Sequence, residues 1–310
     1  MAPAPMFTRF ISYLSFCVMI LVLVAGCTQP QPVEQSSPVI AAGATLQQID
    51  TSYVFTEGPA VDASGNVYFT DQPNDQIVKW STDGELSVFM EGTGRANGLY
   101  FDDAGNLLAC ADENNELWSI SMDKDVDVLV TDFEGKKLNG PNDLWIDADG
   151  GIYFTDPFYK RSYWTREEKE IEDERLYYVS PDRQTVSVAA DGFVRPNGLI
   201  GTPDGNTLYV ADIGDSKTYA FTINPDASLS DRRLFAEMGS DGMTLDTAGN
   251  VYLTGDGVTV FDPSGEKIEH IPVDEKWTAN VTFGGADRQT LFVTAMGAVY
   301  TLDMQVAGVR

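Results

Sequence analysis

The stretch PNDLWIDADGGIYFTDP, residues 141–157, contains two short apolar runs joined by a turn rich in Asp and Gly. Apolar runs of this length with such a turn between them are typical of a β-hairpin. The first run nevertheless begins beside an uncharged amide, Asn142, and an acid, Asp143. A strand suited to burial that starts with an amide needs an explanation beyond sheet packing.

Related stretches recur along the chain, and their spacing predicts the fold. Six copies begin at Glu57, Asn97, Asn142, Asn197, Asp241 and Asn280, so that successive starts lie 40, 45, 55, 44 and 39 residues apart. Each interval has room for about four short strands. Four-stranded units of this length are typical of β-propeller blades. Gly or Pro recurs about every ten residues and no apolar stretch keeps a 3.6-residue period, which argues against helical repeats. We therefore predict an all-β, six-bladed β-propeller over residues 45–310.

The two ends of this domain are predicted to close the last blade together. The sixth copy contains only three predicted strands, near residues 281–284, 290–295 and 298–303. The segment ATLQQIDT, residues 44–51, is predicted to supply the fourth. Pairing the N-terminal and C-terminal strands in this way leaves no open sheet edge.

Residues 1–26 are predicted to be a secretion signal, because an apolar run from Ile11 to Ala25 follows a segment whose only charged side chain is Arg9. The sequence Val24-Ala25-Gly26-Cys27 resembles a bacterial lipobox, which implies lipidation of Cys27. An ordinary signal peptide or a membrane anchor are the alternatives. Residues 27–44, rich in Pro, Gln and Ser, are predicted to be a flexible tether. We expect an exported protein, lipid-anchored to the bacterial cell envelope, at the outer membrane or facing the periplasm in a Gram-negative organism.

The composition limits the classes of partner that the protein is expected to bind. The chain has 47 acidic and 20 basic side chains and a formal charge of -27, which argues against nucleic acid or an anionic membrane surface as a partner. Membrane contact is expected only through the lipid anchor, and no obligate protein partner is inferred. Of the three cysteines, only Cys110 lies in the globular part, so no intramolecular disulfide is expected there. Its place in the run NLLACA predicts a buried apolar residue.

The residue that opens each copy carries a side-chain oxygen in all six cases. The first strand of each blade lines the channel of a propeller and strand direction alternates, so these six residues are predicted to share one mouth of the channel. We call them the oxygen ring. Carboxylate and amide oxygens are the ligands of a hard divalent cation such as Ca²⁺. The alternative is that Asn and Asp are favoured at strand starts by local hydrogen bonds. Turn chemistry alone is expected for Asp62, Asp102, Asp147 and Asp246.

The repeats also carry a family resemblance over the chain from about residue 46 onward. It rests on Thr56-Glu57-Gly58-Pro59, Pro141-Asn142-Asp143, Pro196-Asn197-Gly198-Leu199, Asp241-Gly242-Met243 and Asn280-Val281-Thr282-Phe283-Gly284-Gly285. The chain resembles the gluconolactonase and senescence-marker-protein family of six-bladed propellers, whose relatives include diisopropylfluorophosphatases. The resemblance implies that Glu57, Asn142, Asn197 and Asp241 hold a catalytic metal ion and that Asp241 is also the base or nucleophile. It implies that Asn97 and Asn280 contact the substrate or support the metal ligands.

One position departs from the animal branch of that family, where an Arg that touches substrate stands two residues before the third-copy Asn. Here that position is Gly140. A long insert, YKRSYWTREEKEIEDE at residues 159–174, accounts for the 55-residue interval and is predicted to lie at the mouth that holds the oxygen ring. It is either a lid, with Arg161 or Arg166 meeting an anionic substrate, or a solvated surface loop.

These observations favour a metal-dependent hydrolase that opens a small-molecule lactone. A bound cation stabilises the oxyanion that forms as water adds to the carbonyl, and Asp241 accepts the proton of that water. One divalent cation is expected: Ca²⁺ foremost, with Mg²⁺, Mn²⁺ and Zn²⁺ as alternatives. The single histidine, His270, is expected on an outer strand, which argues against a Ser-His-Asp triad. The alternative functions are a phosphotriesterase or arylesterase using the same site, and a non-catalytic binding propeller stabilised by Ca²⁺.

Overall fold

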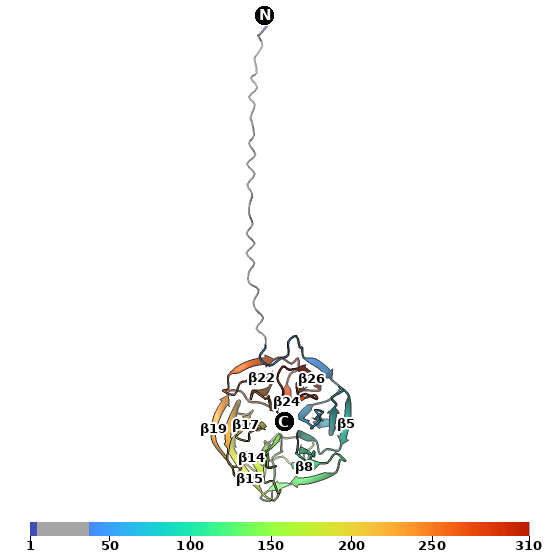
Figure 1. Ribbon diagram of the computed structural model, residues 1–310, viewed down its shortest axis with the longest axis vertical. Helices are drawn as coiled ribbons and strands as arrows, with labels where there is room; N and C mark the ends of the chain where they lie inside the picture. The colour runs from blue at the N-terminus through green and yellow to red at the C-terminus, as the bar shows by residue number, and fades with distance from the viewer. Residues whose placement is uncertain (5–36, 310) are drawn as a thin grey trace. The chain divides into compact units, whose positions relative to one another are not determined.

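The computed structural model describes residues 1–4 and 37–309 (Figure 1). Most of the predicted signal peptide, Cys27 and the first part of the predicted tether lie in residues 5–36, outside the described residues. In the described part of the chain, no helix is long and apolar enough to cross a membrane.

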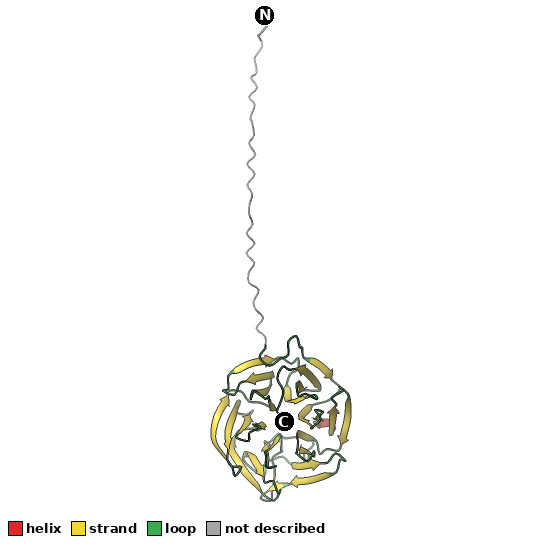
Figure 2. Ribbon diagram, in the orientation of Figure 1, coloured by secondary structure: helices red, strands yellow, loops and turns green. Residues whose placement is uncertain are grey.

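Within these residues the strands form six four-stranded antiparallel sheets around a central axis, with one extra two-stranded hairpin (Figures 1 and 2). The first blade contains β2(Thr56–Val61), β3(Val67–Asp71), β4(Gln76–Trp80) and β5(Leu86–Glu91). The second contains β6(Ala96–Phe101), β7(Leu107–Ala111), β8(Glu116–Ile120) and β9(Val126–Val130). The third contains β12(Leu144–Ile146), β13(Ile152–Asp156), β14(Glu174–Val179) and β15(Val186–Phe193). The hairpin β10(Asp132–Phe133) and β11(Lys136–Lys137) lies between the second and third.

The remaining blades complete the circle. They are β16(Pro196–Gly201), β17(Thr207–Asp212), β18(Lys217–Ile223) and β19(Leu229–Ala236); β20(Met243–Leu245), β21(Val251–Gly255), β22(Gly257–Phe261) and β23(Lys267–Ile271); and β24(Thr278–Gly284), β25(Thr290–Ala295), β26(Ala298–Asp303) and β1(Gln47–Asp50). The prediction of a six-bladed β-propeller is therefore confirmed.

The sixth blade is closed by the two ends of the domain, as predicted. Strand β1 pairs with β26 in antiparallel register, with Gln47 opposite Thr301. Strand β24 begins at Thr278, three residues earlier than the sequence indicated. The N-terminal strand β1 and the C-terminal strands β24 to β26 thus belong to one sheet, and this sheet closes the circle of blades.

Part of the predicted tether is packed against the domain. Val39 has no exposed surface and belongs to the apolar cluster of the fifth and sixth blades. Ile40 forms a β-bridge with Met304, and the backbone N–H of Ala41 donates to the carbonyl of Asp303 at 3.1 Å. The propeller unit therefore begins before residue 45. The free energy gained by burying the Val39 side chain offsets the entropy cost of ordering its Pro- and Ser-rich neighbours.

The C-terminal segment crosses the end of the channel that carries the hairpin turns. Gly308 forms a bridge with Asp246, and the N–H of Val309 donates to the carbonyl of Leu245 at 3.1 Å. The Asp residues of these turns have the role expected of them. Asp62 Oδ1, for example, accepts the backbone N–H groups of Ser64 at 2.8 Å and Asn66 at 2.9 Å.

A second set of aspartates stands at the opposite end of the sheets. Asp71, Asp156 and Asp212 each follow or end the second strand of a blade and are buried. We call them the capping aspartates, because each carboxylate accepts two backbone N–H groups from the loop that precedes the first strand of its own blade. The pairs are Val54 and Phe55, both at 3.1 Å; Asn139 at 2.9 Å and Gly140 at 2.7 Å; and Val194 and Arg195, both at 2.8 Å.

We expect Asp71→Ala to lower the free energy of unfolding by about 1–3 kcal/mol, because two backbone donors would lose their acceptor in a buried place. Urea unfolding followed by circular dichroism measures the change. Asp83→Ala is the control, since Asp83 lies exposed in the next turn of the same blade, and it should change stability by less than about 0.5 kcal/mol. Equal effects of the two substitutions would contradict the capping role.

Candidate functional site

Irregular strand starts position the oxygen ring. In the first, second, fourth and sixth blades, the pairing of the first and second strands shifts register at or next to the ring residue. Such bulges redirect side chains, and they concentrate near functional sites. In the third and fifth blades the ring residue precedes the first regular strand, which begins only at Leu144 or Met243.

Glycines bring neighbouring blades into backbone contact at the ring. Gly58 has φ +46°, and a Cβ there would lie 2.1 Å from the carbonyl oxygen of Asn97. A Cβ on Gly242 would lie 1.9 Å from the Cγ of Asn280. No other residue type fits such an approach without displacing the next blade. The ring residues are consequently drawn together around the axis.

Buried threonines from the second strands fix the next blade. Thr70 Oγ1 donates to the carbonyl oxygen of Asn97 at 3.1 Å, and Thr155 Oγ1 donates to that of Asn197 at 2.8 Å. These bonds hold the backbone of the ring residues, so their side chains remain free to point into the channel.

Two ring pairs are joined by side-chain hydrogen bonds. Asn280 Nδ2 donates to Glu57 Oε2 at 3.0 Å, and Asn197 Nδ2 donates to Asp241 Oδ1 at 2.7 Å. The indole Nε1 of Trp277 donates to the other oxygen, Asp241 Oδ2, at 2.6 Å. The structure thus brings the six predicted residues into one circle at one end of the channel, and it adds Trp277, which the sequence analysis did not single out.

A third carboxylate, that of Asp143, lies among these residues. Burial and, to a smaller extent, the nearby Asp241 carboxylate together raise the pKa of Asp143 to about 8. Burial likewise raises the pKa of Asp241 to about 6, and burial together with Asp241 and Asp143 raises the pKa of Glu57. Desolvation and like charge both disfavour the ionised state here. The site is therefore short of positive charge.

The sequence held a signal for Asp143 that the prediction did not use. The residue after the ring position is Gly in four blades, where it permits the contact between blades, but it is Asp143 in the third and Val281 in the sixth. A carboxylate at a position that is Gly in four of the six blades is unusual and marks the third blade as different. With Asp143, the site contains three buried carboxyl groups, of which two belong to the oxygen ring.

The donor set fits a hard divalent cation. In the described part of the chain, the buried Oδ1 atoms of Asn97 and Asn197 have no hydrogen-bond partner, and the carboxyl groups of Glu57, Asp143 and Asp241 make no ion pair. No group of three or more His, Cys, Asp and Glu residues among residues 37–309 is arranged to hold a metal. Amide oxygens, including that of the buried Asn142, would therefore have to complete the ligands.

The insert at residues 159–174 joins β13 to β14 and reaches the ring. Tyr159 Oη accepts a hydrogen bond from Asn197 Nδ2 at 3.0 Å. At Gly140, a Cβ would lie 3.1 Å from the Cη2 of Trp164, so the insert fills the space beside this position. Arg161 contacts Asp112 through Nε at 3.0 Å and makes no hydrogen bond to a ring residue among residues 37–309.

A cavity of about 670 Å³ lies on the other side of the ring, toward the hairpin turns. Asp143 and Asn280 line it together with turn residues such as Asp62 and Asp102. Its position differs from the predicted substrate mouth, since it opens at the end of the channel where the C-terminal segment lies. The paired carboxylate and amide groups lie at the ring end.

Two further residues have the surroundings expected for them. Cys110 is fully buried in an apolar cluster, and burial raises the pKa of its thiol. His270 lies on β23, the outer strand of the fifth blade, where its Nδ1 is 3.1 Å from Thr259 Oγ1. Neither residue takes part in the ring.

A six-bladed propeller whose channel carries a buried ring of carboxylate and amide oxygens defines a recognisable class of protein. The family model described as SMP-30/Gluconolactonase/LRE-like region matches residues 55–297. The chain belongs to this family.

Named relatives agree with this assignment. The gluconolactonase of Zymomonas mobilis is 25% identical over 287 residues, covering 83% of this chain and 80% of the relative. A solved gluconolactonase from Xanthomonas campestris is 31% identical with a TM-score of 0.79, covering 86% of this chain and 91% of that one. Regucalcin from Agrobacterium tumefaciens, a calcium-binding protein, has a TM-score of 0.72 at 20% identity, with 86% and 96% covered, which shows the same fold.

We expect Glu57→Gln to stabilise the chelator-treated protein by about 1–2 kcal/mol, because it removes the cost of burying a carboxyl group whose pKa burial and two neighbouring carboxylates raise. Glu57 Oε2 accepts both the Gly58 N–H and Asn280 Nδ2, so a glutamine carbonyl in that place keeps both bonds. Thermal unfolding with and without Ca²⁺ measures the effect. Wild type should gain stability from Ca²⁺ and the variant should not. Destabilisation in chelator, with the exposed Glu85→Gln unchanged, would contradict the charge argument.

Proposed function

We propose that this protein is a metal-dependent lactonase whose reaction takes place at the oxygen ring. The observation that carries the proposal is the arrangement of Asp241, whose two carboxylate oxygens are held by different donors beside the other ring carboxylates. The relatives named gluconolactonase support lactone hydrolysis as the reaction. No histidine or cysteine is required.

Glu57, Asn142, Asn197 and Asp241 would hold the cation. When bound, the cation supplies Lewis-acid stabilisation of the negative charge that develops on the lactone carbonyl oxygen. Its ligands are oxygens only, which favours Ca²⁺, with Mg²⁺, Mn²⁺ or Zn²⁺ as alternatives. The fold neighbour described as calcium-binding is in keeping with this choice.

Asp241 is the proposed base that accepts the proton of the attacking water. Asn197 Nδ2 and Trp277 Nε1 fix the carboxylate plane, so no rotation is needed to present an oxygen. In the metal-free protein, burial raises the pKa of Asp241 to about 6, above that of an exposed Asp.

Other residues are proposed to orient the substrate. Asn97 and Asn280 lie on the ring beside the ligands, and the unpaired Oδ1 of Asn97 can accept a substrate hydroxyl. Arg161, on the insert, is proposed to reach the substrate from above the ring. The insert also covers part of the ring through Tyr159, which reduces the access of bulk water.

We expect Asp241→Asn to lower kcat for lactones by at least about 100-fold, the lower range for loss of a general base. Hydrolysis of D-glucono-δ-lactone and a small lactone panel measures it, after chelation and again with Ca²⁺, Mg²⁺, Mn²⁺ or Zn²⁺ restored. Wild type should lose activity on chelation and regain it with one metal. Asp226→Asn, on an exposed turn, is the matched control.

The same assay separates the alternatives. Full activity in the Asp241→Asn variant would overturn the proposed base. No turnover by a folded wild-type protein that still binds Ca²⁺ would favour either hydrolysis of phosphotriesters and aryl esters, tested with paraoxon and phenyl acetate, or a binding propeller.

We also propose that the protein is exported and lipid-anchored to the cell envelope through Cys27. Cys27→Ser should move the protein from the membrane fraction to the soluble fraction and abolish incorporation of labelled palmitate in a bacterial host. The control is Cys17→Ser, which lies inside the apolar run and should leave labelling unchanged. Membrane association that survives Cys27→Ser would instead favour an uncleaved anchor.

A further inference from the structure

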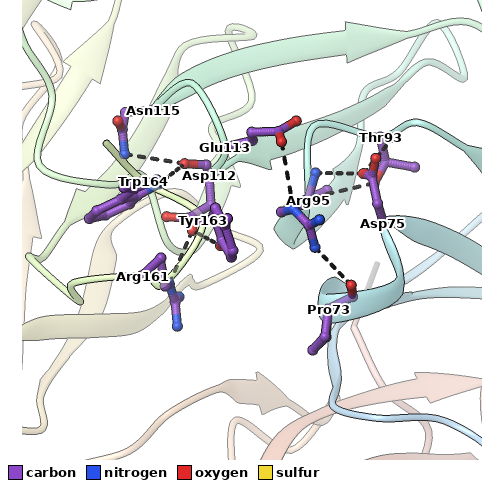
Figure 3. Close-up of polar contacts among 11 residues, drawn as sticks. Pro73, Asp75, Thr93, Arg95, Asp112, Glu113, Asn115, Arg161, Tyr163 and Trp164 are labelled. Atoms are coloured by element: carbon purple, nitrogen blue, oxygen red, sulfur yellow. Dashed lines mark hydrogen bonds and ion pairs between the residues drawn. The ribbon is translucent and has the colours of Figure 1, made fainter. Parts of the chain in front are cut away.

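The second blade breaks the pattern of the capping aspartates. Asp112 follows β7 at the place where Asp71, Asp156 and Asp212 stand in their blades, but it accepts no backbone N–H from the loop before β6. That loop is held instead by Asp75 of the first blade, whose Oδ1 accepts the N–H groups of Thr93 at 2.8 Å and Arg95 at 2.7 Å. The Asp112 carboxylate is thereby released for another role (Figure 3).

Asp112 binds the insert instead. Its Oδ2 accepts Arg161 Nε at 3.0 Å and the Tyr163 hydroxyl, and its backbone carbonyl accepts Trp164 Nε1 at 2.8 Å (Figure 3). Asp112 is only 2% exposed, so an unpaired charge there would be costly. Three contacts to one buried residue hold this part of the insert in a defined position rather than as a free loop.

The contact with Asp112 leaves the far end of the Arg161 guanidinium available. Its Nε is used, and within residues 37–309 neither Nη atom has a hydrogen-bond partner. The Arg161 Cζ lies 5.5 Å from the ring centroid of Tyr159, and the Arg195 Cζ lies 5.0 Å from the same centroid. Tyr159 in turn is bonded to Asn197 of the oxygen ring. Two guanidinium groups therefore flank a residue that touches the ring.

The two guanidinium groups beside Tyr159 are not fully neutralised by acids. Acidic side chains outnumber basic ones by 47 to 20, yet in the described part of the chain the Arg195 guanidinium has no ion pair. Arg161 shares its ion-pair partner, Asp112, with Tyr163. Guanidinium groups placed in this way bind planar anions through two parallel N–H bonds.

We propose that the site takes lactones that carry an anionic substituent, which Arg161 and Arg195 bind beside Tyr159 while Asp112 positions Arg161. The inference rests on the proposed function for the reaction itself, and it adds the substrate class. Asp112 is a positioning residue, because it acts through Arg161 and does not touch the substrate. The negative surface elsewhere repels such a substrate, so this pair of cations also directs it to the ring.

A matched pair of substrates tests the anion subsite. The γ-lactone of D-galactonic acid and the enantiomer of galactaric acid γ-lactone with the same ring configuration share one ring and differ in a hydroxymethyl against a carboxylate group. Wild-type full-length protein should favour the carboxylate lactone in kcat/KM. Arg161→Ala should lower kcat/KM for the carboxylate lactone by roughly 10- to 100-fold and for the neutral one by less than about 3-fold, as expected for loss of a charged hydrogen bond.

Lys160→Ala is the control for charge alone. Lys160 is the neighbouring basic residue on the same insert, but it is exposed and paired with Glu167. The Lys160→Ala substitution should leave kcat/KM for both lactones unchanged. If it lowers kcat/KM for the carboxylate lactone as much as Arg161→Ala does, the insert acts through its overall charge and the assigned subsite is wrong.

Asp112→Asn tests positioning. It should lower kcat/KM for the carboxylate lactone by roughly 3- to 10-fold, chiefly through KM, with the neutral lactone nearly unchanged, because a neutral amide holds the guanidinium less firmly. In an Arg161→Ala background the substitution should have no further effect on the ratio of the two substrates. A loss shared equally by both substrates would show that Asp112 only maintains the fold.

Binding measurements keep this test separate from the test of hydrolysis. Fluorescence of the tryptophans near the ring, Trp164 and Trp277, can report binding of each lactone to wild type and to Arg161→Ala. If neither lactone is hydrolysed but the carboxylate lactone binds more tightly and loses that advantage in Arg161→Ala, the anion subsite stands and the proposed reaction fails. Equal binding of the two lactones by wild type overturns the subsite.

Discussion

The close approach of neighbouring first strands around the axis is the constraint on which the rest of this structure depends. At Gly58, Gly98, Gly198 and Gly242 a Cβ atom would collide with the backbone or side chain of the next blade. The contacts between blades therefore leave no room for side chains at these positions, and the residues just before them are forced toward the axis. The geometry that closes the propeller is the same geometry that gathers the ring.

Gathering buried carboxyl groups around the axis costs free energy that a bound cation can offset. Buried carboxylates are unfavourable when they are near one another and far from positive charge. The protein can carry them because they stand on strands held by large apolar clusters, by the buried threonines and by the pairing of β1 with β26. A rigid scaffold of this kind prevents the acids from moving apart, which is what keeps the donor oxygens in place for a ligand.

Much of this could be predicted from the sequence because the decisive patterns are local and repeated. The hairpin motifs give the number of blades, the missing strand of the sixth copy predicts the closure, and the first residue of each copy gives the ring. Val39 was assigned to a tether, because its Pro- and Ser-rich neighbours obscure one apolar residue that packs on a distant strand. Val39 packs in a cluster that includes Met304, far along the chain, and its neighbour Ile40 bridges Met304; no local pattern reports such contacts.

Departures from the repeat were harder to predict than the repeat itself. Asp112 has the same sequence context as the capping aspartates, and only the three-dimensional structure shows that Asp75 has taken over its task. Asp143 was visible in the sequence, but its importance depends on the distance to carboxylates from other blades. In both cases the role comes from which long-range partner is present, and residue type and spacing do not report it.

The position of the insert has a consequence for how this protein can change over evolutionary time. Asp156 and Arg175, on either side of it, face each other across antiparallel strands. A tight turn could join those strands, so the loop can be lengthened, shortened or exchanged without shifting the register of the blade. Changes of length or composition in this one continuous piece of sequence would therefore leave the acids and amides of the oxygen ring, which stand on six other segments, in place.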